Sequence, residues 1–171
     1  AGLLKARRVN ENNISVNMGK LSNNWQNIPL AYEMDTLNIP ITIKNFSKGV
    51  AVNVGNPHIV FFGKNINDLD LNEIGPQIEN HDFFPSKTNV EFVEVISQSK
   101  IKMRVWERGA GITLACGSGA CASVFAGIKK NLLSKKVEVL LSLGSMYISI
   151  ENEEAIMTGP AEISFTGSIT I

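Results

Sequence analysis

Cys116 is the residue whose surroundings most favour chemistry. It lies in the segment TLACGSGAC, directly before a stretch of helical character. Backbone N–H groups at a helix start lack partners and together carry about half a positive charge, so they stabilise a thiolate and can lower a cysteine pKa below about 8.5. The small residues Gly117, Ser118 and Gly119 leave these N–H groups open to a carboxylate or phosphate. The alternative is a buried structural cysteine before a glycine-rich turn.

Cys121 follows five residues later, inside the predicted helix, and we expect it to be a core residue. Two cysteines are too few for a disulfide scaffold, and their spacing matches none of the common zinc patterns. We therefore predict no metal site.

Two polar segments could serve the same site. GNPH supplies Asn56, a donor and acceptor, and His58, which titrates near neutral pH, although its composition alone predicts a turn. RVWERG supplies Glu107 and Arg108, which could form a weak surface ion pair or could bind an amine and a carboxylate. Asn89, at the start of a predicted strand, is equally ambiguous by itself.

Many short strands and one buried helix must position these residues. Apolar residues cover every face of the segment 117–133, which is typical of a helix that is buried all round. A shorter helix is predicted within 67–80, limited by Pro76. Period-two alternation and β-branched residues predict a hairpin over the first 18 residues and strands at 39–43, 50–54, 58–62, 89–96, 101–106, 137–143, 146–151, 155–158 and 163–171. This pattern predicts an α+β fold in which a mixed or antiparallel sheet curls around a central helix.

Composition excludes several classes of protein. The 171 residues suit one domain, and 16 basic residues balance 16 acidic ones, so charge gives no reason to expect nucleic acid or an anionic membrane as a partner. A hydrophobic fraction of 44% argues against disorder, and no apolar run approaches the roughly 18 residues of a membrane span. The chain begins AGLLKARR, without Met or a signal-peptide pattern, and we expect it to be part of a longer protein.

Taken together, the segments GNPHIV, TNVEFVEV and RVWERGAGITLACGSGACAS resemble the second half of diaminopimelate epimerases in order, spacing and residue identity. The resemblance covers residues 53–123, and CGSGAC with RVWERG upstream is its most specific part. It implies cofactor-independent conversion of LL-diaminopimelate to meso-diaminopimelate in lysine and cell-wall precursor synthesis. In this family, two cysteines from two similar lobes remove and deliver a proton on opposite faces of the α-carbon.

The resemblance also implies roles for residues. Cys116 corresponds to the catalytic cysteine of the second lobe, as base for one epimer and acid for the other. His58 and Glu107 correspond to residues that tune the thiol pair. The corresponding substrate-binding positions are Asn56, Asn89, Glu107, Arg108, Gly117 and Ser118, with Arg108 on the distal carboxylate and the backbone N–H groups of Gly117 and Ser118 on the reacting one.

One part of the family pattern is missing. The first cysteine of the family lies in an MCGNG-type segment of the N-terminal lobe, and this chain has no such segment. We therefore expect a single C-terminal lobe, with residues 1–18 as an inter-lobe hairpin, 19–160 as the lobe body and 161–171 as a strand that returns to the missing lobe. The expected partners are diaminopimelate, that N-terminal lobe and, as is usual in the family, a second copy in a homodimer. We expect a cytoplasmic protein without cofactor or metal that is inactive alone.

Other functions stay open on the sequence. A related two-lobed isomerase, such as a proline racemase or a phenazine-pathway isomerase, would share the architecture, but the residues of WERG and GNPH favour the diaminopimelate branch. A cysteine hydrolase using Cys116 with His58 and a non-catalytic binding lobe are the two remaining alternatives.

Overall fold

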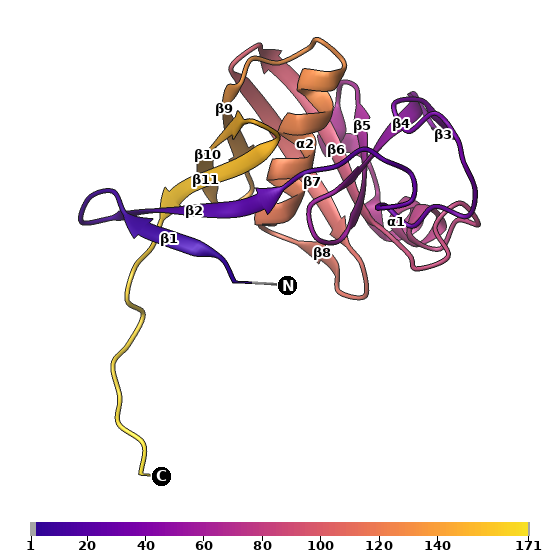
Figure 1. Ribbon diagram of the computed structural model, residues 1–171. Helices are drawn as coiled ribbons and strands as arrows, with labels where there is room; N and C mark the ends of the chain where they lie inside the picture. The colour runs from indigo at the N-terminus through magenta and orange to yellow at the C-terminus, as the bar shows by residue number, and fades with distance from the viewer. Residues whose placement is uncertain (1–2, 171) are drawn as a thin grey trace.

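The computed structural model describes residues 3–170, which form one large mixed sheet with few helices (Figure 1). Its strand order is β1-β2-β11-β10-β9-β7-β6-β5-β4-β3, and β8 pairs with β7 outside this path. The pairs β5–β6 and β7–β9 are parallel and the others antiparallel. The strands are β1 (Lys5–Arg8), β2 (Asn13–Lys20), β3 (Ile39–Ile43), β4 (Phe46–Asn53), β5 (Pro57–Phe62), β6 (Asn89–Ser97), β7 (Lys100–Glu107), β8 (Gly111–Thr113), β9 (Lys136–Leu141), β10 (Gly144–Glu151) and β11 (Glu154–Pro160).

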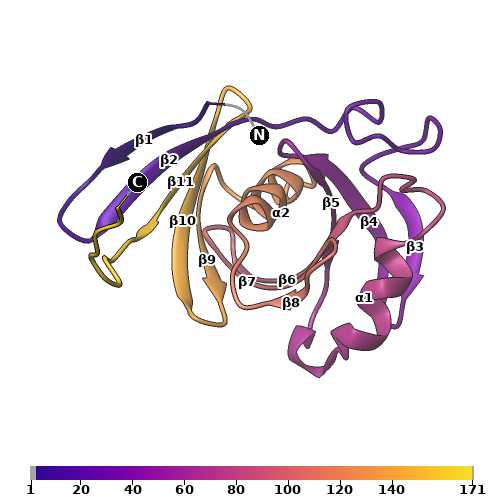
Figure 2. The same ribbon diagram turned by 90° about the horizontal axis from the view of Figure 1, so that it is seen from below.

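Helix α2 (Gly117–Lys129) lies on one face of this sheet and contacts strands from both of its halves, from β4, β5 and β6 to β10 and β11 (Figure 2). Nine consecutive residues, 119–127, are buried, which confirms that the helix is covered all round. The predicted α+β class and mixed sheet are confirmed. The sheet is open, because β1 and β3 stand at the two ends of the strand order and do not pair with each other.

The opposite face of β6 and β7 is covered by α1 (Leu71–Glu79), which follows a 3-10 turn at Ile66–Asp68. Asp70 caps α1 by accepting a hydrogen bond from the Asn72 N–H, and the helix continues through Pro76. Alternation along the strands divides the core in two. Val60, Val93 and Val105 pack with α2, whereas Ile59, Phe61 and Phe92 pack with α1.

Three expectations need correction. The central helix ends at Lys129 rather than Leu133, because Asn131 takes a positive φ of 58° and the N–H groups of Leu132 and Leu133 bond the Gly127 carbonyl. Strand β8 was not predicted, since only three residues pair with the end of β7.

The third correction concerns the predicted strand 163–171. Residues 161–170 form no strand, and Ile163, Phe165 and Ile169 are exposed, because no neighbouring strand provides backbone partners (Figure 1). Ile171 lies outside the described residues, as do Ala1 and Gly2 of the predicted hairpin. Pairing of this segment with another lobe stays a prediction.

Candidate active site

Cys116 is the N-cap residue of α2. Its Sγ accepts a hydrogen bond from the Gly119 N–H at 3.3 Å and lies 3.5 Å from the Ser118 Oγ. The N–H groups of Gly117 and Ser118 belong to the first helical turn, where a helix provides no carbonyl partners. The thiol is buried, with only 7% of the residue exposed. The sulfur therefore lies at the start of the helix, beside N–H groups that have no partner within the helix.

The glycines of this helix start permit close packing. A Cβ on Gly117 would lie 2.8 Å from the Met157 Sδ, and a Cβ on Gly119 would lie 2.8 Å from the Glu91 Oε1 and 3.2 Å from the Cys116 Sγ. Separations under 3.0 Å are not tolerated without movement of the neighbouring atoms. Gly119 is therefore the position at which the buried carboxyl group of β6 approaches the sulfur.

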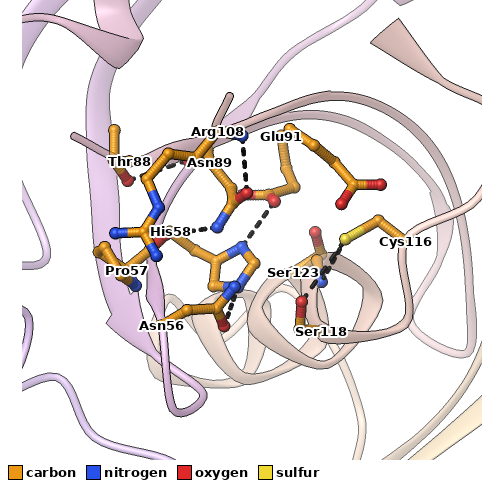
Figure 3. A network of polar contacts seen from close by, with 12 residues as sticks. Asn56, Pro57, His58, Thr88, Asn89, Glu91, Arg108, Cys116, Ser118 and Ser123 are labelled. Atoms are coloured by element: carbon orange, nitrogen blue, oxygen red, sulfur yellow. Dashed lines mark hydrogen bonds and ion pairs between the residues drawn. The ribbon is translucent and has the colours of Figure 1, made fainter. Parts of the chain in front are cut away.

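A chain of hydrogen bonds runs beside the thiol (Figure 3). His58 on β5 contacts the Glu91 Oε1 through Nδ1 at 2.7 Å and the Asn56 Oδ1 through Nε2 at 2.9 Å. His58 and Glu91 are completely buried. Gly55, with a φ of 94°, makes the turn that places Asn56 at the start of β5. The structure thus joins the two polar residues of GNPH to β6.

Asn89 holds two segments of the site together. Across the parallel β5–β6 pair it lies opposite His58. Its Nδ2 donates to the Pro57 carbonyl at 2.8 Å, and its Oδ1 accepts from the Arg108 N–H at 2.9 Å. Because these contacts are to backbone, the buried Asn89 amide fixes the start of β5 to the turn after β7.

Glu107 and Arg108 have separate partners. The Thr113 hydroxyl donates to the Glu107 Oε1, while the Arg108 guanidinium donates to the Ser86 carbonyl at 2.9 Å. Arg108 is exposed and Glu107 is partly buried. The sequence left open a surface ion pair between Glu107 and Arg108. In the structure, each side chain instead bonds to a different partner.

The expected low pKa of Cys116 is wrong for this chain. Burial raises the pKa of the thiol to about 11, and the charges of Glu91 and Glu107 act in the same direction. The hydrogen bonds from Ser118 and Gly119 lower it, as the helix-start argument anticipated, but they do not outweigh burial. Cys116 is therefore a protonated thiol at neutral pH. Burial also raises the pKa of the core residue Cys121, to about 12.

Glu91 is the residue of this site that sequence reasoning missed. Burial raises its pKa, and His58 opposes this effect. A signal was present, because Glu91 follows Asn89 by two residues in an alternating strand and so shares its face. Because the residues around Glu91 are apolar, the segment was interpreted only as a strand and not as part of the site.

The described residues contain neither a metal-binding cluster nor a membrane-spanning helix. Over residues 3–170, no group of three or more His, Cys, Asp or Glu side chains is arranged to hold a metal ion. No helix in that range is both long and apolar enough to cross a membrane.

The fold is similar to that of two solved structures. Over 95% of its length it is similar to a phenazine biosynthesis protein of the PhzF family from Enterococcus faecalis, with a TM-score of 0.61 and 12% identity, covering 59% of that chain. Over 92% of its length it is similar to a hydroxyproline epimerase from Agrobacterium vitis, with a TM-score of 0.60 and 11% identity, covering 54% of that chain. At these identities the likeness concerns the fold alone.

Sequence identifies the family within this fold. Residues 50–164 match the family described as Diaminopimelate epimerase. The chain is 45% identical to the diaminopimelate epimerase of Pelagibacter ubique over 94% of its length and 46% identical to that of Carboxydothermus hydrogenoformans over 98%. The chain belongs to the diaminopimelate epimerase family. It spans 61% and 62% of the length of these two relatives.

Proposed function

We propose that this chain supplies one of two catalytic cysteines, and much of the substrate site, for the cofactor-independent epimerisation of LL-diaminopimelate to meso-diaminopimelate in the cytoplasm. The observation that carries the proposal is the position of Cys116, whose sulfur caps a helix start beside a buried polar network. Epimerisation needs an acid on one face of the α-carbon and a base on the other. A protonated Cys116 suits the acid, and the base comes from the rest of the protein.

The helix start would bind the reacting carboxylate. The N–H groups of Gly117 and Ser118 offer donors to its oxygens, and the helix dipole favours negative charge there. This binding also favours removal of the α-proton, because charge that develops toward the carboxylate meets donors already in place. In the step that completes LL-to-meso conversion, the Cys116 Sγ–H bond breaks, its proton joins the α-carbanion, and the electron pair stays on sulfur.

The remaining polar groups would select a substrate with two amino-acid ends. The exposed Arg108 guanidinium suits the distal carboxylate, and Asn56, Asn89 and Glu107 correspond to the family's positions for the other polar groups. His58 and Glu107 would tune the thiol pair, His58 through the buried network and Glu107 through its charge near Cys116.

The rest of the protein would cover the Cys116 side of this chain. Ala115, Met146 and Met157 are among the residues that line an apolar groove of about 400 Å³. Leu114, next to it in sequence, is 54% exposed. Both features support a covering lobe, which would also bring the second cysteine. A homodimer of the completed protein is a further expectation from the family.

Proton exchange tests the proposal. In D₂O, the chain alone should not convert diaminopimelate to the inverted, α-deuterated epimer, because one face of the α-carbon has no base. A chimera that adds the missing N-terminal part of the Carboxydothermus relative should exchange diaminopimelate and lose this activity with Cys116→Ala. Inversion by the chain alone, or an active Cys116→Ala chimera, would contradict the proposal.

Substrate comparison separates the alternatives. If the chain came from a proline racemase or a phenazine-type isomerase, the same chimera would act on the substrate of that enzyme. Arg108→Ala should reduce activity only if the substrate has a distal carboxylate that Arg108 binds. A hydrolase would form an acyl adduct on Cys116. A non-catalytic lobe would bind diaminopimelate, seen as shifts of the Gly117 and Ser118 amide resonances, without exchange in any assembly.

A further inference from the structure

Glu91 has a buried carboxyl group with one oxygen left unsatisfied. Its side chain is completely buried on β6, and Oε1 contacts the His58 Nδ1 at 2.7 Å. Oε2 is the one buried side-chain oxygen or nitrogen without a hydrogen-bond partner in the described part of the chain. An unsatisfied buried carboxylate oxygen costs free energy, so packing alone does not explain a glutamate at this position.

The same carboxyl group adjoins the catalytic sulfur. The point where a Cβ of Gly119 would stand is 2.8 Å from the Glu91 Oε1 and 3.2 Å from the Cys116 Sγ. Only a glycine, which carries no side chain, separates the two groups. Ionisation of Cys116 would place a negative charge next to this carboxyl group in a buried space, where charges are poorly screened.

We propose that Glu91 is a positioning residue of the site, whose buried carboxyl group keeps Cys116 in its protonated, proton-donating form and holds the His58 imidazole toward the Asn56 amide. This proposal rests on the proposed function for its catalytic meaning, but the protonation of Cys116 is measurable without substrate. The direction of the Cys116 pKa agrees with it, since Glu91 is the largest cause of the increase after burial.

Three other titratable groups lie around the sulfur. Glu107, from the end of β7, raises the Cys116 pKa as well. Cys121, from the next turn of α2, is a neutral buried thiol at neutral pH. His58, from β5, is directed to Glu91 and Asn56 by its two hydrogen bonds. Burial and the carboxyl groups of β6 and β7 therefore favour the neutral thiol, and the hydrogen bonds of the helix start oppose them.

Alkylation of the purified chain tests the proposal. The Cys116 thiolate attacks iodoacetamide and releases iodide, so the rate between pH 7 and 9.5 reports the thiolate fraction, and mass spectrometry separates Cys116 from Cys121. Glu91→Gln keeps the shape but removes the charge. We expect this variant to have a lower Cys116 pKa and a faster alkylation rate. For each unit by which the pKa falls, the thiolate fraction rises about tenfold, but the alkylation rate rises only about threefold, because the nucleophilicity of a thiolate falls with its pKa.

Two variants serve as controls. Glu94→Gln removes a charge from the same strand on the opposite face and should leave the Cys116 rate unchanged within about 1.5-fold. Glu91→Asp restores the charge and should return the rate toward that of the unaltered chain. A Glu91→Gln rate equal to that of Glu94→Gln would overturn the proposal.

The unaltered chain provides an independent measurement. If Glu91→Gln unfolds, which fast alkylation of Cys121 would reveal, the pH profile of native Cys116 still tests whether its thiol is kept protonated. The proposal requires a rate that rises without a plateau up to pH 9.5. A plateau below pH 9 would overturn it, because Cys116 would then be an ordinary or acidic thiol.

Discussion

The two faces of strands β5 and β6 differ although they are built from alternate residues of the same segments. The face toward α2 carries His58, Asn89 and Glu91, all buried and hydrogen-bonded. The face toward α1 carries aromatic residues, with Phe61 stacked on Phe92 at 5.5 Å between ring centroids and Phe46 edge-on to Phe92 at 5.2 Å.

The difference shows how a polar site can be kept rigid. Apolar burial on the α1 face stabilises the strands in proportion to the area removed from water. Those strands then hold the polar groups of the α2 face, whose own burial contributes little net stability. We therefore expect substitution of the aromatic residues to affect mainly stability, and substitution of the polar residues on the α2 face to affect mainly thiol chemistry.

Phe92→Ala should have the largest effect on stability. Removal of a completely buried phenyl ring should lower the free energy of unfolding by about 3–5 kcal/mol, measured by urea denaturation. The alkylation rate of Cys116 in the folded variant should stay within twofold of the native rate. A large change in that rate with little loss of stability would reverse the assignment of the two faces.

Gly119→Ala should have an intermediate effect, confined to the site face. The added methyl group would displace Glu91 or Cys116, and overpacking of this kind costs about 1–3 kcal/mol. The alkylation rate of Cys116 should change as well, unlike in Phe92→Ala. Gly159→Ala is the matched control, since its methyl group would make only an ordinary 3.5 Å contact with Met146. Equal stability of the Gly119→Ala and Gly159→Ala variants would contradict close packing of Glu91 and Cys116 around Gly119.

Alkaline pH should weaken the fold through the α2 side. Burial raises the pKa of Cys116 to about 11, so the folded chain keeps a proton that the unfolded chain releases above about pH 8.5. Between these values stability falls as pH rises, by about 1.4 kcal/mol per pH unit for each such thiol. Cys121, with a pKa of about 12, adds a similar slope.

Urea unfolding at pH 8, 9 and 10 under reducing conditions measures this slope. Cys116→Ser should reduce it by about half, because a serine hydroxyl does not titrate in this range. A slope that is unchanged in Cys116→Ser would show that the Cys116 thiol is not kept protonated by the fold.

An ion pair away from both cores should have the smallest effect. Lys100 and Glu138 join β7 to β9 at 2.9 Å, and both are partly exposed. A double-mutant cycle with Lys100→Ala and Glu138→Gln should give a coupling of about 0.2–1 kcal/mol that decreases in high salt. A coupling above 2 kcal/mol would mean that stability does not reside mainly in the two cores.

Sequence predicted the parts of this molecule that depend on local pattern. Alternation located nearly all the strands, and a run of apolar residues on every face located α2. It overextended α2 because apolar residues continue to Leu133, past Asn131, whose positive φ follows the end of the helix. It placed a strand at 163–171 because alternation reports a tendency to pair, whereas a strand also requires a neighbour.

Sequence reasoning selected candidate residues for the site but did not reveal the electrostatics around them. Residue types and spacing, with the family resemblance, selected Cys116 and its helix-start amides, Asn56, His58, Asn89, Glu107 and Arg108. They could not reveal that a carboxyl group from β6 lies across Gly119 from the sulfur, because that approach depends on packing between a strand and a helix start 25 or more residues apart in sequence.

The sequence by itself determined which groups could do chemistry here: one cysteine at a helix start, small residues after it, and an arginine and amides for a polar substrate. Tertiary structure decided the protonation state of that cysteine. Helix-start hydrogen bonds favour the thiolate, whereas burial and the Glu91 charge favour the thiol, and the balance depends on desolvation and distance. Neither quantity exists until the strands and the helix have packed together.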